Sequence, residues 1–124
     1  MLNFNRTHAP AALVVTVLLC AVFGFVHAAT PPPIKLIGAV GPGVKITLKK
    51  GNKSVVSLKQ GAYSITINDR STQHNFHLSG PEINRSTPVG SSVTRTWTLT
   101  LKPGTYTYRC DPHASMKASF RVTR

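Results

Sequence analysis

The segment from Tyr106 to Met116 of this 124-residue chain reads YTYRCDPHASM and is its most informative one. It opens with alternating side chains, so both tyrosines and Cys110 face one side of an expected strand and the residues between them face the other. The strand is expected to end before Pro112, because proline has no amide hydrogen to donate to a neighbouring strand. A thiol, an imidazole and a thioether then share one tight loop, as Cys110, His113 and Met116.

This set of side chains predicts a copper site. Soft sulfur ligands combined with imidazole suit copper, and two histidines, one cysteine and a weakly bound methionine form the ligand set of electron-transfer copper sites. The loop supplies three of these four ligands. A second histidine must therefore come from another part of the chain.

His74 and His77 are the candidates for that histidine. They belong to a short strand expected over residues 74–78, in which Phe76 and Leu78 must face the core. The two-residue period of a strand puts His74 on the side of Phe76 and Leu78, and His77 on the opposite side. We therefore predict His74 as the remaining metal ligand and place His77 on the solvent side or behind the ligands.

The beginning of the chain has the pattern of a secretory signal. Arg6 and His8 precede an apolar run from Ala11 to Val26, and residues 26–28, Val-His-Ala, fit the small-residue rule for signal-peptidase cleavage. We predict that residues 1–28 are a cleaved signal peptide and that the protein is exported, to the periplasm or outside the cell. An uncleaved anchor is the alternative, although the run is short for a membrane span.

Cleavage would leave residues 29–124, a single domain with one cysteine, Cys110, because Cys20 leaves with the signal. One thiol cannot close an internal disulfide, and burial as a metal ligand would protect it from oxidation.

Cleavage of the signal also leaves 14 lysines and arginines against three carboxylates, a net charge of +11. Such a field favours acidic partners, and nucleic acid is the partner least expected for an exported protein.

Short alternating segments separated by glycine and proline predict an all-β fold without helices. The expected strands cover residues 34–40, 44–49, 63–68, 74–78, 93–101, 105–110 and 120–123, and residues 82–90 are expected to form a loop. Val44, Ile46 and Leu48 should face the core in the second of them. A turn at 102–104 should join the strands expected over 93–101 and 105–110 as an antiparallel hairpin. About seven short strands predict an antiparallel β-sandwich or barrel.

The run HNFH at 74–77, followed by CDPHASM at 110–116, resembles the type 1 (blue) copper proteins, the cupredoxins, and is most similar to their plastocyanin and amicyanin branches. The resemblance covers residues 29–124 in strand order. It implies an antiparallel Greek-key β-sandwich of eight strands with one type 1 copper ion near one end. His74, Cys110 and His113 would form the trigonal plane, Met116 would be the axial ligand, and Asn75 would tie the two ligand-bearing loops together.

The expected function is electron transfer rather than enzymatic catalysis. An exported chain of this kind would carry single electrons between redox partners by cycling between Cu(II) and Cu(I), with the exposed edge of His113 as the port. We expect a monomer that forms transient complexes with an acidic redox protein, binds no nucleic acid and has no stable membrane insertion after the signal is removed.

Several alternatives remain open. The chain is an exported copper carrier or buffer in one of them, although it lacks the methionine-rich clusters of a Cu(I) shuttle. Another is a metal-free basic β-sandwich that binds polyanions of the cell envelope, which leaves the four ligands unexplained. Structural zinc prefers four strong ligands, which a methionine is not. A Cys110–His113 nucleophile would need an orienting group that the sequence does not supply.

Overall fold

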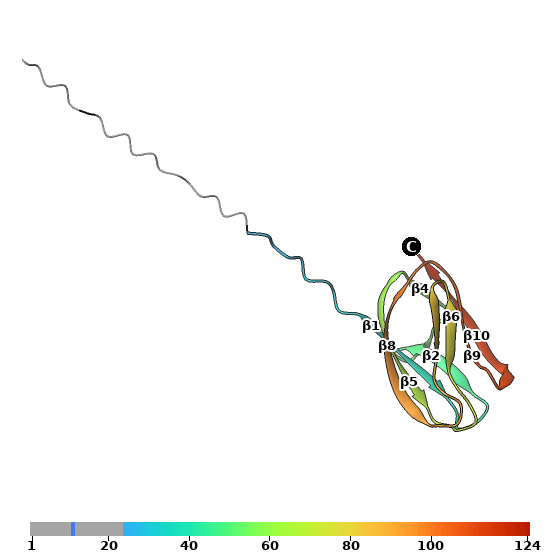
Figure 1. Cartoon of the computed structure of the whole chain (residues 1–124). Coiled ribbons are helices and arrows are strands. Elements are labelled where there is room, and N and C mark those ends of the chain that lie inside the picture. The colour runs from blue at the N-terminus through green and yellow to red at the C-terminus, as the bar shows by residue number, and fades with distance from the viewer. Residues whose placement is uncertain (1–10, 12–23) are drawn as a thin grey trace, which may run out of the picture.

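The computed structural model describes Ala11 and residues 24–124. Residues 24–33 form neither helix nor strand, and the following residues fold into two β-sheets that face each other (Figure 1). The predicted signal peptide, residues 1–28, falls mostly outside the described residues and stays a prediction. Within the described part, no helix has the length and apolar character needed to cross a bilayer.

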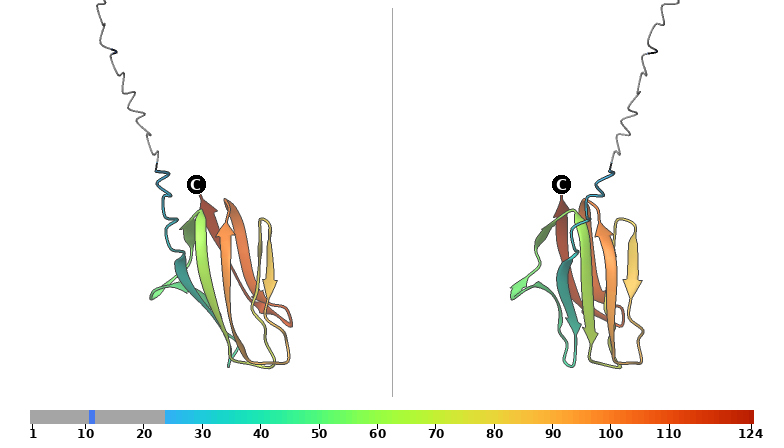
Figure 2. Two further views of the ribbon diagram at one scale, coloured as in Figure 1. Left: turned by 60° about the vertical axis from the view of Figure 1, so that its left-hand side comes forward. Right: turned by 90° about the vertical axis from the view of Figure 1, so that its left-hand side faces the viewer.

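Each sheet has five strands, and Figure 2 shows the two layers from the side. The first sheet contains, in spatial order, β3 (Lys53–Ser54), β2 (Ile46–Lys50), β1 (Ile34–Val40), β5 (Gly61–Asp69) and β8 (Val93–Leu101). The second contains β4 (Ser57–Lys59), β10 (His113–Thr123), β9 (Gly104–Cys110), β6 (His77–Gly80) and β7 (Ile83–Ser86). The predicted all-β sandwich is confirmed, although each sheet includes one parallel pair, β1 with β5 and β4 with β10.

The core fills the space between the sheets. Tyr63, Ile65 and Ile67 on β5 are at most 1% exposed, as the alternation of that segment predicts. Aromatic rings from the second sheet complete the core, since Tyr106 stacks on Phe120 with ring centroids 5.3 Å apart. Rigid packing of this kind holds both ends of the sandwich in fixed positions.

The prediction that Val44 faces the core is wrong. Val44 is 78% exposed, and β2 begins only at Ile46. The amide of Gly41 donates to the Lys45 carbonyl and the amide of Lys45 donates to the Gly43 carbonyl, so a tight turn carries Val44 outside the sheet.

The predicted hairpin across residues 102–104 is also wrong. β8 pairs with β5 in the first sheet, whereas β9 pairs with β10 and β6 in the second. The connection therefore crosses from one sheet to the other. The Tyr106 hydroxyl secures the crossing, because it accepts from the Lys102 amide and donates to the Lys102 carbonyl, both at 3.0 Å.

Three further strand bounds differ from the sequence-based expectation. The expected loop over 82–90 contains the polar edge strand β7, which pairs with β6. The strand expected over 74–78 begins only at His77, because the Phe76 amide donates to the Thr87 hydroxyl at 2.8 Å rather than to a neighbouring strand. The last strand, β10, is eleven residues long and begins within the ligand loop, at His113.

The strands run lengthwise and define two ends of the sandwich. Ile34 pairs with Tyr63 at one end of the first sheet, and Val40 pairs with Asp69 at the other. The end near Val40 and Asp69 is also where β9 finishes, at Cys110. The predicted metal ligands lie at this end.

Candidate metal centre

Three side chains converge at this end. The Nδ1 atoms of His74 and His113 lie 3.0 Å apart, and the Cys110 Sγ lies 3.6 Å and 3.5 Å from them. The two imidazole rings meet edge to face, with centroids 4.6 Å apart and planes at 70°. In the described part of the chain this is the group of side chains arranged to hold a metal ion, and it contains no carboxylate.

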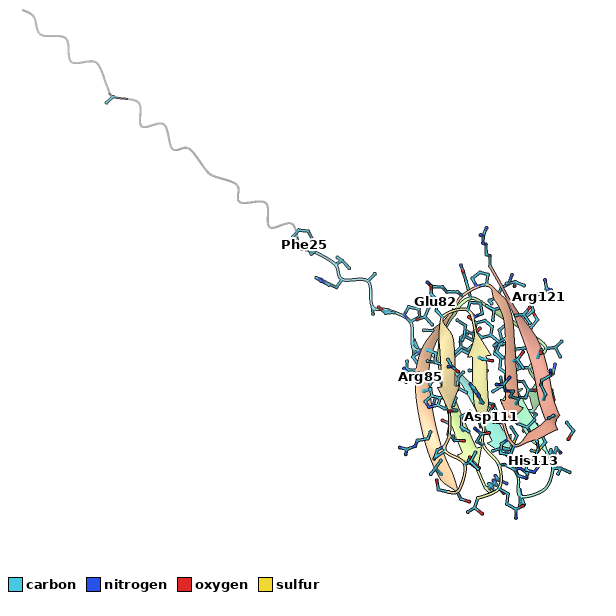
Figure 3. The ribbon with its side chains drawn as sticks, turned by 45° about the vertical axis from the view of Figure 1, so that its right-hand side comes forward. Phe25, Glu82, Arg85, Asp111, His113 and Arg121 are labelled. Carbon is cyan, nitrogen blue, oxygen red and sulfur yellow. The ribbon has the colours of Figure 1, made fainter. Side chains whose placement is uncertain are left out.

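Each donor is fixed by a different segment. Cys110 ends β9 with its side chain 1% exposed, on the same side as Tyr106 and Tyr108, as the alternation predicts. His74 lies in the connection between β5 and β6 and is 4% exposed. His113 begins β10 directly opposite Cys110 and is partly exposed (Figure 3).

Met116 follows on the same turn. It is 3% exposed and lies in the stretch between His113 and Lys117, where the register between β9 and β10 shifts. The shift gives the hairpin room for a turn whose side chains need not alternate. The structure thus buries Met116 on the ligand loop, and its role as axial ligand stays a prediction.

Gly41 allows another turn to approach His74. A Cβ on Gly41 would lie 2.8 Å from the Ser71 Cβ and 3.4 Å from the His74 Cδ2, and its φ of +70° is one that other residues rarely adopt. In the sequence, Gly41-Pro42-Gly43 only separates the first expected strand from the second. Its closeness to His74 becomes visible only in three dimensions.

Asn75 joins the two ligand-bearing segments. Its Nδ2 donates to the Asp111 Oδ2 at 2.8 Å, and its Oδ1 accepts from the Asp111 main-chain amide, also at 2.8 Å. Asn75 is only 3% exposed and the Asp111 side chain is 39% exposed, so the two bonds lie at the boundary between the core and solvent. This is the tie between the loops that the resemblance implied.

Asp111 extends this tie to the neighbouring strands. Its carboxylate also accepts from the His77 Nδ1 at 2.8 Å and from the Arg109 Nε at 3.0 Å. Desolvation by burial raises the pKa of Asp111, but the hydrogen bonds from Asn75, His77 and Arg109 outweigh it and lower that pKa to about 2. His77, whose Nε2 faces the Asn84 Oδ1, therefore lies outside the donor group and braces it through Asp111.

A second brace, a chain of hydrogen bonds through the Thr87 hydroxyl, fixes the segment of His74 against β5. The buried Asp69 carboxylate accepts from the Thr87 hydroxyl at 2.6 Å, and that hydroxyl accepts from the Phe76 amide at 2.8 Å. Sequence reasoning missed both Asp69 and Thr87 as parts of the site. The one available signal was an acidic residue at the end of an otherwise apolar strand face, after Ile65 and Ile67.

The spacing of the donors fits one copper ion. Bonds as long as those of zinc, about 2.0 Å to imidazole and about 2.3 Å to thiolate, in one plane would separate the three donor atoms by about 3.5 to 3.7 Å. The observed 3.0 to 3.6 Å is close to that, and a thiolate with two imidazoles suits copper better than hard cations, which prefer oxygen.

The comparisons with known proteins agree on the fold. A rusticyanin variant superposes with a TM-score of 0.56 and 16% identity over 76% of this chain and 80% of that chain. Rusticyanin from Thiobacillus ferrooxidans superposes with a TM-score of 0.52 and 16% identity, over 76% of this chain and 79% of that chain. Reduced auracyanin from Roseiflexus castenholzii superposes with a TM-score of 0.52 and 19% identity, over 76% of this chain and all of that chain. No family model and no curated protein matches the sequence.

The chain has the cupredoxin fold, and its His74, Cys110 and His113, with Met116 buried on the same loop, fit a single type 1 copper site.

Proposed function

We propose that this chain is an exported blue copper protein that carries single electrons between redox partners and is not an enzyme. The observation that carries the proposal is the convergence of His74, Cys110 and His113 at one end of a rigid sandwich. Its structural neighbours support it, because rusticyanin is described as a copper protein, and both rusticyanin and auracyanin have been determined in reduced form.

The ligands divide into three buried residues and one that reaches solvent. Cys110, Met116 and His74 are at most 4% exposed, whereas His113 is partly exposed. Bound copper would supply a Cu(II)/Cu(I) couple held by these four side chains. His113 would then be the port through which an electron enters or leaves, since it connects the buried donors with the surface.

The hydrogen bonds that brace the site would also favour electron transfer. Electron transfer is fast when ligands barely move between oxidation states, and side chains locked by hydrogen bonds to rigid elements move little. Asn75 and Asp111 hold the Cys110 loop against the segment of His74, and Thr87 holds that segment against β5. The fold thereby limits the rearrangement that each electron would cause.

The charge around the site supports an acidic, transient partner. All three carboxylates of the described chain are engaged: Asp69 is buried, Glu82 pairs with Lys102, and Asp111 pairs with Arg109. The remaining lysines and arginines are left to set the surface potential. A hollow of about 230 Å³ beside the ligand loop is lined by Arg109, Asp111 and Lys117. Since Arg109 and Asp111 pair with each other, Lys117 leaves the hollow with a net positive charge that would steer an acidic protein toward it.

Voltammetry of the copper-loaded protein tests the function. We expect a reversible one-electron wave, and a higher potential in Met116→Leu, because a lost thioether donor destabilises Cu(II) more than Cu(I). Ser115→Ala, an exposed change on the same turn, should leave the potential unchanged. A chain that binds copper but releases it on reduction would be a carrier, and the proposal would be wrong.

The acidic partner is tested separately with small redox reagents of opposite charge. Anionic hexacyanoferrate should react faster than cationic hexaammineruthenium after correction for driving force, and the difference should shrink as salt is added. Lys117→Glu should reduce the difference. Equal salt dependence for both reagents would contradict the assignment of an acidic partner.

A further inference from the structure

Two adjoining hollows lie on the side of the sandwich away from the metal centre. Their volumes are about 360 Å³ and 250 Å³, and they share Lys50, Ser57 and Leu58. Ile34 and Tyr63 line the larger one, and Lys53 and Val56 line the smaller. The larger volume is within the range of small-molecule sites, about 300 to 1,000 Å³.

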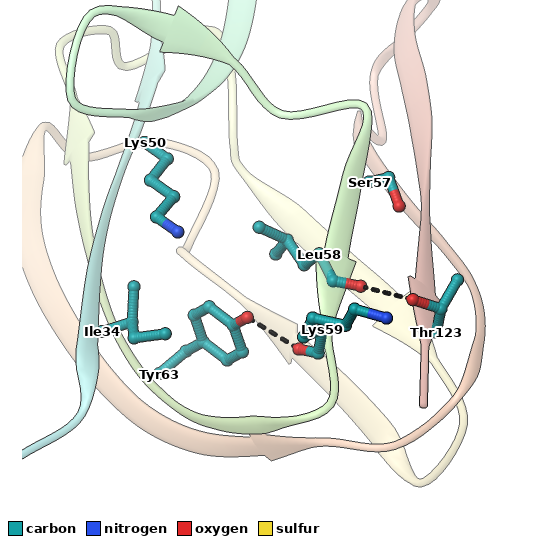
Figure 4. A pocket seen from close by; sticks show the side chains of 7 residues that line it. All are labelled: Ile34, Lys50, Ser57, Leu58, Lys59, Tyr63 and Thr123. Carbon is teal, nitrogen blue, oxygen red and sulfur yellow. Dashed lines mark hydrogen bonds between the residues drawn. The ribbon is translucent and has the colours of Figure 1, made fainter. Parts of the chain in front are cut away.

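The polar part of this groove is cationic. Lys50, Lys53 and Lys59 line it, and none of its lining residues is acidic. Lys59 is already engaged, since its Nζ donates to the Arg124 main-chain oxygen at 2.7 Å. Within the described residues, the ammonium of Lys50 has neither a hydrogen bond nor an ion pair, and it points into the space between Ile34, Leu58 and Tyr63 (Figure 4).

The hydroxyl groups of the groove are partly used as well. The Tyr63 hydroxyl donates to the Lys59 carbonyl at 2.7 Å, and the Thr123 hydroxyl donates to the Leu58 carbonyl at 3.5 Å. Among the described residues that line the larger hollow, Lys50 and Ser57 therefore supply the donors that remain for a ligand, and Lys53 adds another in the smaller hollow. Together they suit one anionic group such as a carboxylate.

The floor of the groove is apolar. Leu58 and Tyr63 are 6% and 1% exposed, and Ile34 at its rim is 41% exposed although it is a large hydrophobic residue. A ligand that met only the lysines would leave the exposed part of Ile34 in water, whereas an apolar chain would cover it at about 25 cal/mol per Å². The larger hollow thus combines the unpaired ammonium of Lys50 with the partly exposed side chain of Ile34, above a buried apolar floor.

We propose that this groove binds a small amphiphilic anion, a carboxylate with a short aliphatic chain, with its head on Lys50 and its chain against Ile34, Leu58 and Tyr63. The site is independent of electron transfer. It shares no residue with the metal centre, and it lies at the opposite end of β1, about 20 Å away by strand rise. A ligand there would leave His113 open to partners.

The test titrates the 15N-labelled, copper-loaded protein in its reduced state with octanoate and follows the amide resonances. We expect saturable shifts at Ile34, Ser57 and Leu58, and none at His74. Lys50→Gln should weaken the affinity about tenfold, the effect of losing one charged hydrogen bond. Lys49→Gln is the matched control, because it removes the same charge from the next residue of β2, outside the groove, and should leave the affinity unchanged.

Two further probes separate the parts of the ligand. Inorganic phosphate carries charge without a chain, and 1-octanol carries a chain without charge, so each should bind at least tenfold more weakly than octanoate. If phosphate bound as tightly as octanoate, the groove would be a simple anion site. If 1-octanol bound as tightly, the groove would be a simple apolar site. Either result would overturn the proposal. So would an equal loss in Lys49→Gln, or the absence of saturable shifts.

Discussion

The two hydrogen bonds between Asn75 and Asp111 should contribute more to stability than any other pair of side-chain bonds at this end of the sandwich. Asn75→Leu keeps the size of the side chain but removes both bonds, each 2.8 Å long. A bond to a charged acceptor contributes about 1.5 to 3 kcal/mol and a neutral one about 0.5 to 1.5 kcal/mol, so the expected loss is about 3 kcal/mol.

The assay is thermal unfolding of the metal-free protein, so that metal binding does not mask the loss. A decrease of about 3 kcal/mol should lower the Tm by about 12 to 24 °C in a domain of this size. Asn68→Leu is the control, because Asn68 is partly exposed and accepts only one 3.4 Å bond, from Thr94. That variant should change the free energy of unfolding by less than about 0.5 kcal/mol. If both variants lost the same stability, the tie between the ligand segments would not be the cause.

Three further predictions concern the core and the braces. Gly80→Ala should destabilise the protein by about 1 to 3 kcal/mol, because the added Cβ would lie 2.3 Å from the buried Tyr106 ring. Thr87→Val should cost about 2 to 3 kcal/mol in urea unfolding, since it leaves the buried Asp69 without its 2.6 Å donor. Asp111 has a pKa lowered to about 2 in the folded state, so its stabilisation should be fully present above about pH 4 and be lost as the pH falls toward 2. Because its side chain is 39% exposed, we expect solvent to reduce this contribution to about 1 kcal/mol.

Each of these has an internal control. Gly43→Ala meets nothing within 4 Å and should be neutral, and Thr87→Ser keeps the hydroxyl and should retain most of the stability. Asp111→Asn should flatten the dependence of stability on pH between 4 and 2. Unchanged acid sensitivity in that variant would assign the dependence to another carboxylate, and a neutral Gly80→Ala would mean that the Tyr106 ring has room to move.

Side-chain alternation predicted the strands that have one buried face. Tyr63, Ile65 and Ile67 on β5 are examples, because a strand packed on a core must place every second residue inside. The donor atoms were predictable for a different reason: a thiol, two imidazoles and a thioether with this spacing have few uses apart from binding a soft metal.

The sequence-based errors come from interactions between distant segments. The turn after Leu101 has hairpin chemistry, but nothing local shows that β9 joins the opposite sheet. β7 is polar because it is an edge strand held by main-chain bonds to β6, so periodicity could not reveal it. The role of Asp111 depends on Asn75, which is 36 residues earlier in the chain.

The most direct test of the central claim is a visible absorption spectrum of the protein titrated with Cu(II), with electron paramagnetic resonance on the same sample. The structure predicts one equivalent of copper, an intense thiolate-to-copper band and a narrow hyperfine splitting, all lost in Cys110→Ser. A pale complex, or a band that survives in Cys110→Ser, would contradict a copper site built on His74, Cys110 and His113.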